Sequence, residues 1–336
     1  MAQLFPTTYD ELTYKDTGGD YDNMALWYAG ECQGVDMVTA TRGQVLRPYT
    51  KSDGGAYDDT ITMLLGTCTT NAEYFSAIIA ADGHRGTKTT GARFENTTAV
   101  ANVILSTGIG HTTFARLGVK AVTTSIVADS AAIGIRVVAG GGKVVENTTY
   151  DCTSVSVDTG AGIGIFINNT TAYIACNFIT GSRSGASTTL GAGLRMGNTG
   201  TINRTVYSYA NTIYDNDGYD IRLTKTSTGT LTVEAKNVLY HTAGGTGAGS
   251  TLNETTCQDS ATATLAADGY HLAAATNDGT DLRTDGVWAV LTDIDGDAYA
   301  ATPSIGCDQW VAAGGIKFVE LIVKSFVAPI VTRLLQ

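Results

Sequence analysis

The chain reads Gly164-Ile165-Phe166-Ile167 near its middle, where a small residue is followed by apolar, variable and apolar positions. The same pattern occurs at 134–137 and 193–196, and again with an acidic first residue at 220–223. A period of two in apolar residues is typical of β-strands, whereas a helix repeats about every 3.6 residues. These four stretches therefore predict four short strands.

A second short unit begins with asparagine and alternates strictly with the first, at 147–150, 177–180, 211–214 and 237–240. The mean period is about thirty residues, with glycine-rich turns between the units, and such periods indicate a solenoid. We therefore predict an all-β fold, a right-handed parallel β-helix with two or three short strands per coil.

The asparagines of the second unit recur at one place in each coil: Asn147, Asn177, Asn211 and Asn237. Stacked side-chain amides can hydrogen-bond from coil to coil, and asparagine also tolerates the left-handed αL conformation at a bend. We therefore interpret the four residues as a structural ladder rather than as a functional site.

The two ends of the chain lack the repeat, and the open ends of a solenoid need caps. Residues 1–60 hold mixed aromatic sequence and are predicted to form an N-terminal cap with the first irregular coils. Residues 61–310 are predicted to form the β-helix, and 311–336 an apolar C-terminal tail. The tail is expected to serve self-association or docking to a larger assembly, to cap the last coil, or to contact a membrane. Its candidate contact residues are Phe318, Leu321, Ile322, Phe326 and Ile330.

The composition excludes several classes of protein. Charged residues make up only 16% of the 336 residues and hydrophobic ones 43%, which excludes a disordered chain. A net charge of -11 repels a phosphate backbone, so we expect no nucleic-acid partner. No apolar run has the length of a transmembrane helix, and the first residues lack the features of a signal peptide. We therefore expect a protein made in a cytoplasm, with no membrane partner.

Several landmarks follow one another in an order that resembles a family of right-handed parallel β-helix, pectin-lyase-like proteins common in tailed bacteriophages. They are Gly18-Gly19-Asp20-Tyr21 with Leu26-Trp27, then Ala81-Asp82-Gly83-His84, then Thr292-Asp293-Ile294-Asp295-Gly296-Asp297 and Ile305-Gly306-Cys307-Asp308-Gln309-Trp310. The resemblance covers roughly residues 15–310. It implies a virion protein made in the host cytoplasm: a capsid decoration, head fibre or tail spike, acting as a homotrimer. The implied partners are capsid or tail proteins and a host-surface glycan, without a cofactor.

An enzyme is the alternative, because pectin-lyase-like folds often host polysaccharide lyases or glycoside hydrolases. Hydrolysis needs two carboxyl groups about 5–10 Å apart. Asp215, Asp217 and Asp220 form the best local cluster, Glu234 follows one coil later, and Arg222 is the candidate basic residue. The same cluster is also explained as a turn that joins two strands. A bacterial surface adhesin is a third hypothesis.

Asp293, Asp295 and Asp297 offer oxygen ligands that could bind calcium, but they lack EF-hand spacing and also fit an ordinary turn. The four histidines are scattered and no C-x-x-C pair occurs, so no zinc site or Ser-His-Asp set is predicted. The sequence thus favours a non-catalytic structural protein without a cofactor.

Overall fold

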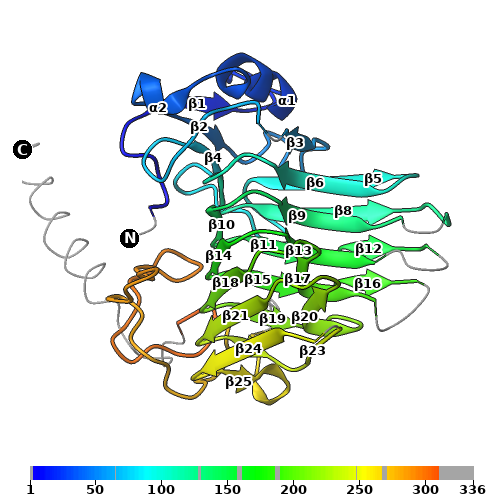
Figure 1. Cartoon of the computed structure of the whole chain (residues 1–336). Coiled ribbons are helices and arrows are strands. Elements are labelled where there is room, and N and C mark those ends of the chain that lie inside the picture. Colours follow the sequence, from blue (N-terminus) through cyan, green and yellow to red (C-terminus); the bar gives the residue numbers. More distant parts are fainter. Residues whose placement is uncertain are drawn as a thin grey trace, which may run out of the picture.

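The computed structural model describes residues 3–309, except 65, 128–129, 157–160, 186–189, 247 and 267–270. The chain winds into a parallel β-solenoid of about seven turns (Figure 1). The prediction of an all-β parallel solenoid is confirmed. Among the described residues, successive coils add strands to three parallel sheets.

The three sheets are named in the order in which a coil visits them. The first sheet holds β1 (Tyr9–Tyr14), β2 (Gly43–Pro48), β4 (Ser76–Ile79), β7 (Thr113–Ala115), β10 (Gly142–Val145), β14 (Ala172–Ala175), β18 (Arg204–Tyr209), β21 (Leu231–Lys236) and β24 (Ser250–Thr255). The second sheet holds β5 (Arg93–Thr98), β8 (Gly118–Thr123), β11 (Thr148–Tyr150), β12 (Thr153–Ser154), β15 (Phe178–Thr180), β16 (Arg183–Ser184), β19 (Thr212–Tyr214), β22 (Leu239–Tyr240) and β25 (Gln258–Asp259). The third sheet holds β3 (Ile61–Met63), β6 (Asn102–Thr107), β9 (Ala132–Val137), β13 (Gly162–Asn168), β17 (Ala192–Asn198), β20 (Tyr219–Lys225) and β23 (Ala243–Thr246).

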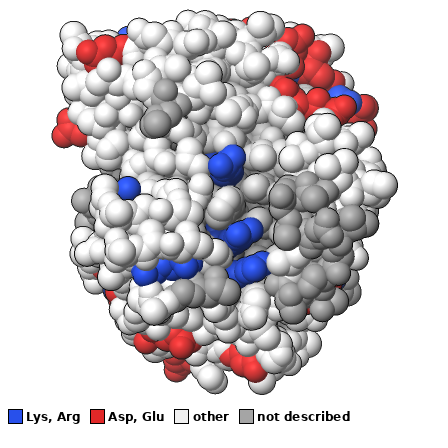
Figure 2. Space-filling model, turned by 45° about the vertical axis from the view of Figure 1, so that its right-hand side comes forward, with Lys and Arg blue, Asp and Glu red and all other residues white. Residues whose placement is uncertain are grey.

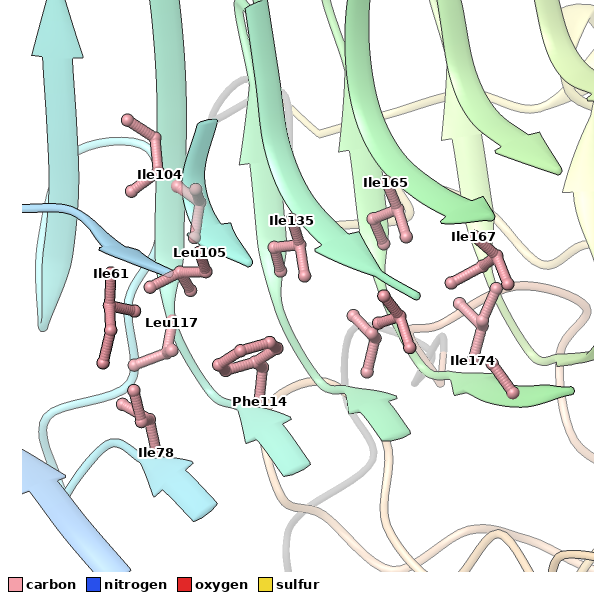
Figure 3. Packing of buried hydrophobic residues seen from close by; sticks show 14 of the residues in the cluster. Ile61, Ile78, Ile104, Leu105, Phe114, Leu117, Ile135, Ile165, Ile167 and Ile174 are labelled. Atoms are coloured by element: carbon pink, nitrogen blue, oxygen red, sulfur yellow. The ribbon is translucent and has the colours of Figure 1, made fainter. Parts of the chain in front are cut away.

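The core fills the space enclosed by the three sheets with stacked apolar side chains. Ile135 pairs with Ile165, and Ile165 with Leu194, so like residues lie on neighbouring strands about 4.8 Å apart. Figure 3 shows Ile135 above Phe114 of the first sheet, and Ile167 above Ile174. All of these side chains are buried, and each such burial contributes about 1.5–3 kcal/mol to stability.

The small first residue of the repeat is required by this packing. Gly134, Gly164 and Gly193 align on neighbouring strands of the third sheet. A Cβ at Gly164 would lie 2.6 Å from the Cγ2 of Ile179 and 2.7 Å from the Oγ1 of Thr149. This position inside β13 therefore has no room for a side chain.

The second repeat unit forms an amide ladder in three consecutive coils. The Nδ2 of Asn147 donates to the Oδ1 of Asn177 at 3.1 Å, and the Nδ2 of Asn177 donates to the Oδ1 of Asn211 at 2.9 Å. All three side chains are fully buried. In the coil before Asn147, the backbone N–H of Leu117 donates to the Oδ1 of Asn147 at 3.1 Å.

Asn237 does not belong to this ladder, which corrects the prediction for the fourth asparagine. Tyr209 pairs with Lys236, so Asn237 aligns with Ala210, and the buried Val238 takes the ladder position. The φ of Asn237 is 53°, which places it in the left-handed region that asparagine tolerates well. This column of left-handed residues consists of Arg116, Glu146, Cys176, Ala210, Asn237 and Thr256.

The N-terminal segment covers one end of the solenoid with short helices, α1 (Met24–Trp27), the π-helix η1 (Tyr28–Cys32) and α2 (Met37–Ala40) (Figure 1). Trp27, the last residue of α1, is fully buried. The side chain of Asn23 caps α1 by accepting from the N–H of Leu26 at 3.0 Å. The same segment also supplies β1 and β2, so the first sheet already starts inside the predicted cap region.

The regular coils end at Asp259, well before residue 310, to which the prediction extended them. A single 3-10 turn, η2 (Ser260–Thr262), follows. Residues 263–266 and 271–309, here called the arm, lie along the outer face of the first sheet (Figure 1). That face carries apolar side chains such as Phe75 and Tyr209, and Trp288 and Tyr299 of the arm pack against this cluster. The arm is thus a cover for an apolar sheet face that would otherwise be exposed to water.

All six cysteines are unpaired, and four of them are buried. Among the described residues, no helix is long and apolar enough to cross a membrane. The predicted contact residues of the tail lie outside the described residues.

Candidate functional site

The variable position of the first repeat unit forms a row on the outer face of the third sheet. Arg136 pairs with Phe166, Phe166 with Arg195, and Arg195 with Arg222. We call these four residues the arginine row. Because the residues on either side of each of them point into the core, the row faces outward, and its members are half-buried.

The guanidinium groups of the row contact aromatic rings. The Cζ atoms of Arg136 and Arg195 lie 6.0 and 5.2 Å from the centroid of Phe166, within the range of a cation–π contact. The Cζ of Arg222 lies 6.0 Å from the ring centroid of Tyr219, and the Nη1 of Arg222 donates to the carbonyl of Leu190 at 3.0 Å. The row is thus held against rings and a backbone carbonyl.

No carboxylate of the described residues pairs with the row, although the chain carries a net charge of -11. The Nε atoms of Arg136 and Arg195 are buried, and neither has a hydrogen-bond partner among the described residues. Burial and the neighbouring charge of Arg222 lower the pKa of Arg195, yet a guanidinium keeps its charge at neutral pH. Like charges on strands about 4.8 Å apart repel each other, so an external anion would stabilise the row.

Figure 2 shows that Lys and Arg side chains gather down the middle of one face, with Asp and Glu toward its upper and lower ends. A guanidinium binds a carboxylate or phosphate through two parallel hydrogen bonds. Arginines repeated along neighbouring strands can therefore contact successive acidic groups of one extended polymer.

The five residues predicted for catalysis do not form one site. Asp215 and Asp217 come together, but both pair with Arg183, at 2.6 and 3.0 Å. Arg222 lies in the arginine row, and Glu234 lies on β21 of the first sheet, where it accepts from the Nδ2 of Asn253 at 2.8 Å.

Asp220, the last of the five, is buried and takes the position of the repeat glycines in its coil. Its carboxylate accepts from the Nδ2 of Asn216 at 2.9 Å and from the N–H of His241 at 2.7 Å. Burial raises the pKa of Asp220. These contacts give the carboxylate a structural role within the coil.

The acidic group in the arm has a different membership from the predicted calcium candidates Asp293, Asp295 and Asp297. Carboxylate oxygens of Asp293, Asp295 and Asp308 lie within 4.8 Å of one another, whereas Asp297 is not part of this group. The Oδ1 of Asp293 accepts from the N–H of Asp295 at 3.1 Å and from that of Asp297 at 2.8 Å. Asp293 therefore organises the turn by hydrogen bonds to the backbone.

The arginine row was missed by sequence reasoning, although its signal is present. The third position of the repeat is arginine in three of four units, at 136, 195 and 222. The pattern identifies these positions as outward-facing, but only the pairing register shows that they form one row.

The chain was also compared with known proteins. It matches no protein-family model, no curated protein and no solved structure.

Proposed function

We propose that this chain is a non-catalytic structural and adhesion protein of a phage particle that binds an acidic glycan along the arginine row. The observation that carries the proposal is the alignment of Arg136, Arg195 and Arg222 around Phe166, without a carboxylate partner among the described residues. A polymer with repeated carboxylates supplies the missing negative charges, and a sugar ring can pack on the exposed part of Phe166.

An acidic polysaccharide fits this surface better than a nucleic acid does. The net charge of -11 repels a long phosphate backbone at a distance, and basic residues elsewhere are largely paired with carboxylates, as Arg183 and Arg47 are. The dispersal of Asp215, Asp220 and Glu234 over different parts of the coil supports binding rather than cleavage.

The resemblance to phage β-helix proteins supports the rest of the proposal: a homotrimer, made in the host cytoplasm and assembled with capsid or tail proteins. Self-association through the apolar tail predicts a trimer for the full chain and a monomer after deletion of residues 311–336. Light scattering measures both masses, and a trimer that persists without the tail would contradict this role of the tail.

The glycan proposal is tested by affinity electrophoresis of the full chain in gels that contain a polyuronate or neutral dextran. We expect retardation by the polyuronate alone, decreasing as salt is added. Arg195→Gln should weaken binding about 10- to 100-fold, as expected for losing a charge-assisted hydrogen-bonding group.

Arg283→Gln is the matched control, because Arg283 is exposed and pairs with Asp281 of the arm at 2.8 Å. It should bind like the unchanged protein. Equal binding by the Arg195→Gln variant, or no retardation by any polyuronate, would overturn the proposal. Release of reducing ends or unsaturated sugars would instead identify a depolymerase, and Asp217→Asn would then test the carboxylates.

A further inference from the structure

The first sheet borders a cavity, whereas the arginine row lies on the third sheet. A cavity of about 410 Å³ opens between the outer face of the first sheet and the arm. Its walls include Lys143 on β10, Tyr173 on β14 and Tyr207 on β18, with Val287 on the side of the arm and His111 at the turn before β7. Its size suits a small molecule, and such cavities are typical ligand sites.

Tyr173 and Tyr207 form an aromatic wall in this cavity. They pair directly across neighbouring strands, and their rings are stacked with centroids 5.3 Å apart and planes inclined by 9°. The ring centroid of Trp288 in the arm lies 5.6 Å from that of Tyr173, so the two rings pack together. The rings are half-buried, so part of this wall stays accessible. The C–H groups of a sugar ring pack well on such aromatic faces, because the faces carry negative partial charge.

Lys143 brings a buried cation to the cavity. The residue is 2% exposed, its Nζ lies 3.5 Å from the centroid of Phe75, and this Nζ has no hydrogen-bond partner among the described residues. Burial lowers the pKa of Lys143 to about 7. A buried, unpaired charge destabilises a fold, which makes such a residue unusual outside a binding site.

His111 adds a second basic group. Its ring packs against Gly141, which also lines the cavity, and burial together with the charge of Lys143 lowers the pKa of His111. Among the described residues, none that lines the cavity is acidic. An anion bound here would interact favourably with both groups.

We propose that this cavity binds a single acidic sugar, with its ring on Tyr173 and Tyr207 and its carboxylate on Lys143 and His111. The side chain of Lys143 has a flexible four-carbon stem, so its ammonium group can turn from Phe75 to the ligand without movement of the backbone. The cavity holds one sugar unit rather than an extended chain, and this inference does not depend on the arginine row.

The test is calorimetric titration of the full chain with glucuronate, galacturonate and N-acetylneuraminate, and with neutral glucose and galactose as controls. We expect at least one acidic sugar to bind ten or more times more tightly than the neutral sugars. Lys143→Met keeps the stem and removes the charge, and it should abolish this preference. Tyr207→Ala should weaken the binding of the same sugar.

Arg283→Gln is the matched control, because it removes an exposed positive charge that pairs with Asp281 and does not line the cavity. It should bind the acidic sugar like the unchanged protein. Failure of the polyuronate to retard the chain would contradict the proposed function but not this inference, so the two tests fail separately. A rise in melting temperature for Lys143→Met would show that the variant folds and that the lysine is held at a cost to stability. Binding of no acidic sugar, equal binding of neutral sugars, or an unchanged preference in Lys143→Met would overturn the proposal.

Discussion

Asn147 and Asn177 are linked across neighbouring coils by a side-chain hydrogen bond of 3.1 Å inside the core. The same Oδ1 of Asn177 also accepts from the backbone N–H of Asn147 at 3.0 Å. Each amide of the ladder therefore satisfies backbone groups at a bend where the regular strand pairing is interrupted. Buried polar groups stabilise a fold only when they are paired in this way.

We predict that Asn177→Ala destabilises the solenoid by about 3 kcal/mol, because it leaves buried polar groups without partners. The orphaned groups are the N–H of Asn147 and the carbonyl of Val144, to which the Nδ2 of Asn177 donates at 2.8 Å. Thermal unfolding followed by circular dichroism should show a melting temperature lower by several degrees. Asn253→Ala, at an exposed position on β24, is the control and should leave the melting temperature unchanged. Equal melting temperatures for both variants would show that the ladder does not contribute.

The second prediction concerns Glu146, which joins the coils to the arm. Its buried carboxylate lies 2.7 Å from the Nη1 of Arg85 and 2.8 Å from the Nε of Arg116, and it accepts from the Oγ1 of Thr292 at 2.6 Å. Glu146→Gln would leave two arginines without their buried counter-charge, at a cost of about 3–5 kcal/mol. We expect the arm to loosen and trypsin to cleave more rapidly after Arg283.

Asp82→Asn is the matched control for Glu146→Gln. Asp82 also pairs with Arg116, at 3.2 Å, but its side chain is 86% exposed, so its loss should cost little. Cleavage rates after Arg283, measured by mass spectrometry, should therefore rise only for Glu146→Gln. Equal rates for the two variants and the unchanged protein would mean that other contacts hold the arm.

The repeat pattern was sufficient to predict the coils, because each strand is specified locally by alternating residues such as Ile135 and Val137. It was not sufficient to place Asn237. The ladder position and the left-handed position are adjacent in each coil, and both favour asparagine. The arm could not be predicted either. Its anchor, Thr292, contacts Glu146, 146 residues earlier in the chain, and no local pattern encodes such a contact.

The candidate sites show the same limit. Arg195 and Arg222 are visible as outward positions of the repeat, but their alignment depends on a register that sequence spacing gives only approximately. The cavity at Lys143 depends on the arm, which supplies Val287 as one of its walls. Both sites therefore required the three-dimensional structure.

The last prediction concerns pH and Asp293, whose side chain is buried in the arm. Burial, reinforced by Asp295, Asp308 and Asp297, raises the pKa of Asp293 to about 7, whereas an unfolded aspartate titrates near 3.9. Between these two values the folded state binds a proton that the unfolded state has released. The contribution of this group to stability is therefore full below about pH 4 and is lost as the pH rises to about 7, by roughly 4 kcal/mol in total.

Asp293→Asn removes the titration and keeps an oxygen that can accept from the N–H groups of Asp295 and Asp297. We expect the variant to be more stable than the unchanged protein at pH 8 and closest to it near pH 4. The Nε2 of His271 lies 3.0 Å from the Oδ2 of Asp295, next to the group under test. Because both proteins keep His271, the difference between their melting temperatures at each pH isolates Asp293. The series is measured in EDTA, so that no divalent cation neutralises the carboxylates, and a difference that does not change with pH would contradict the raised pKa.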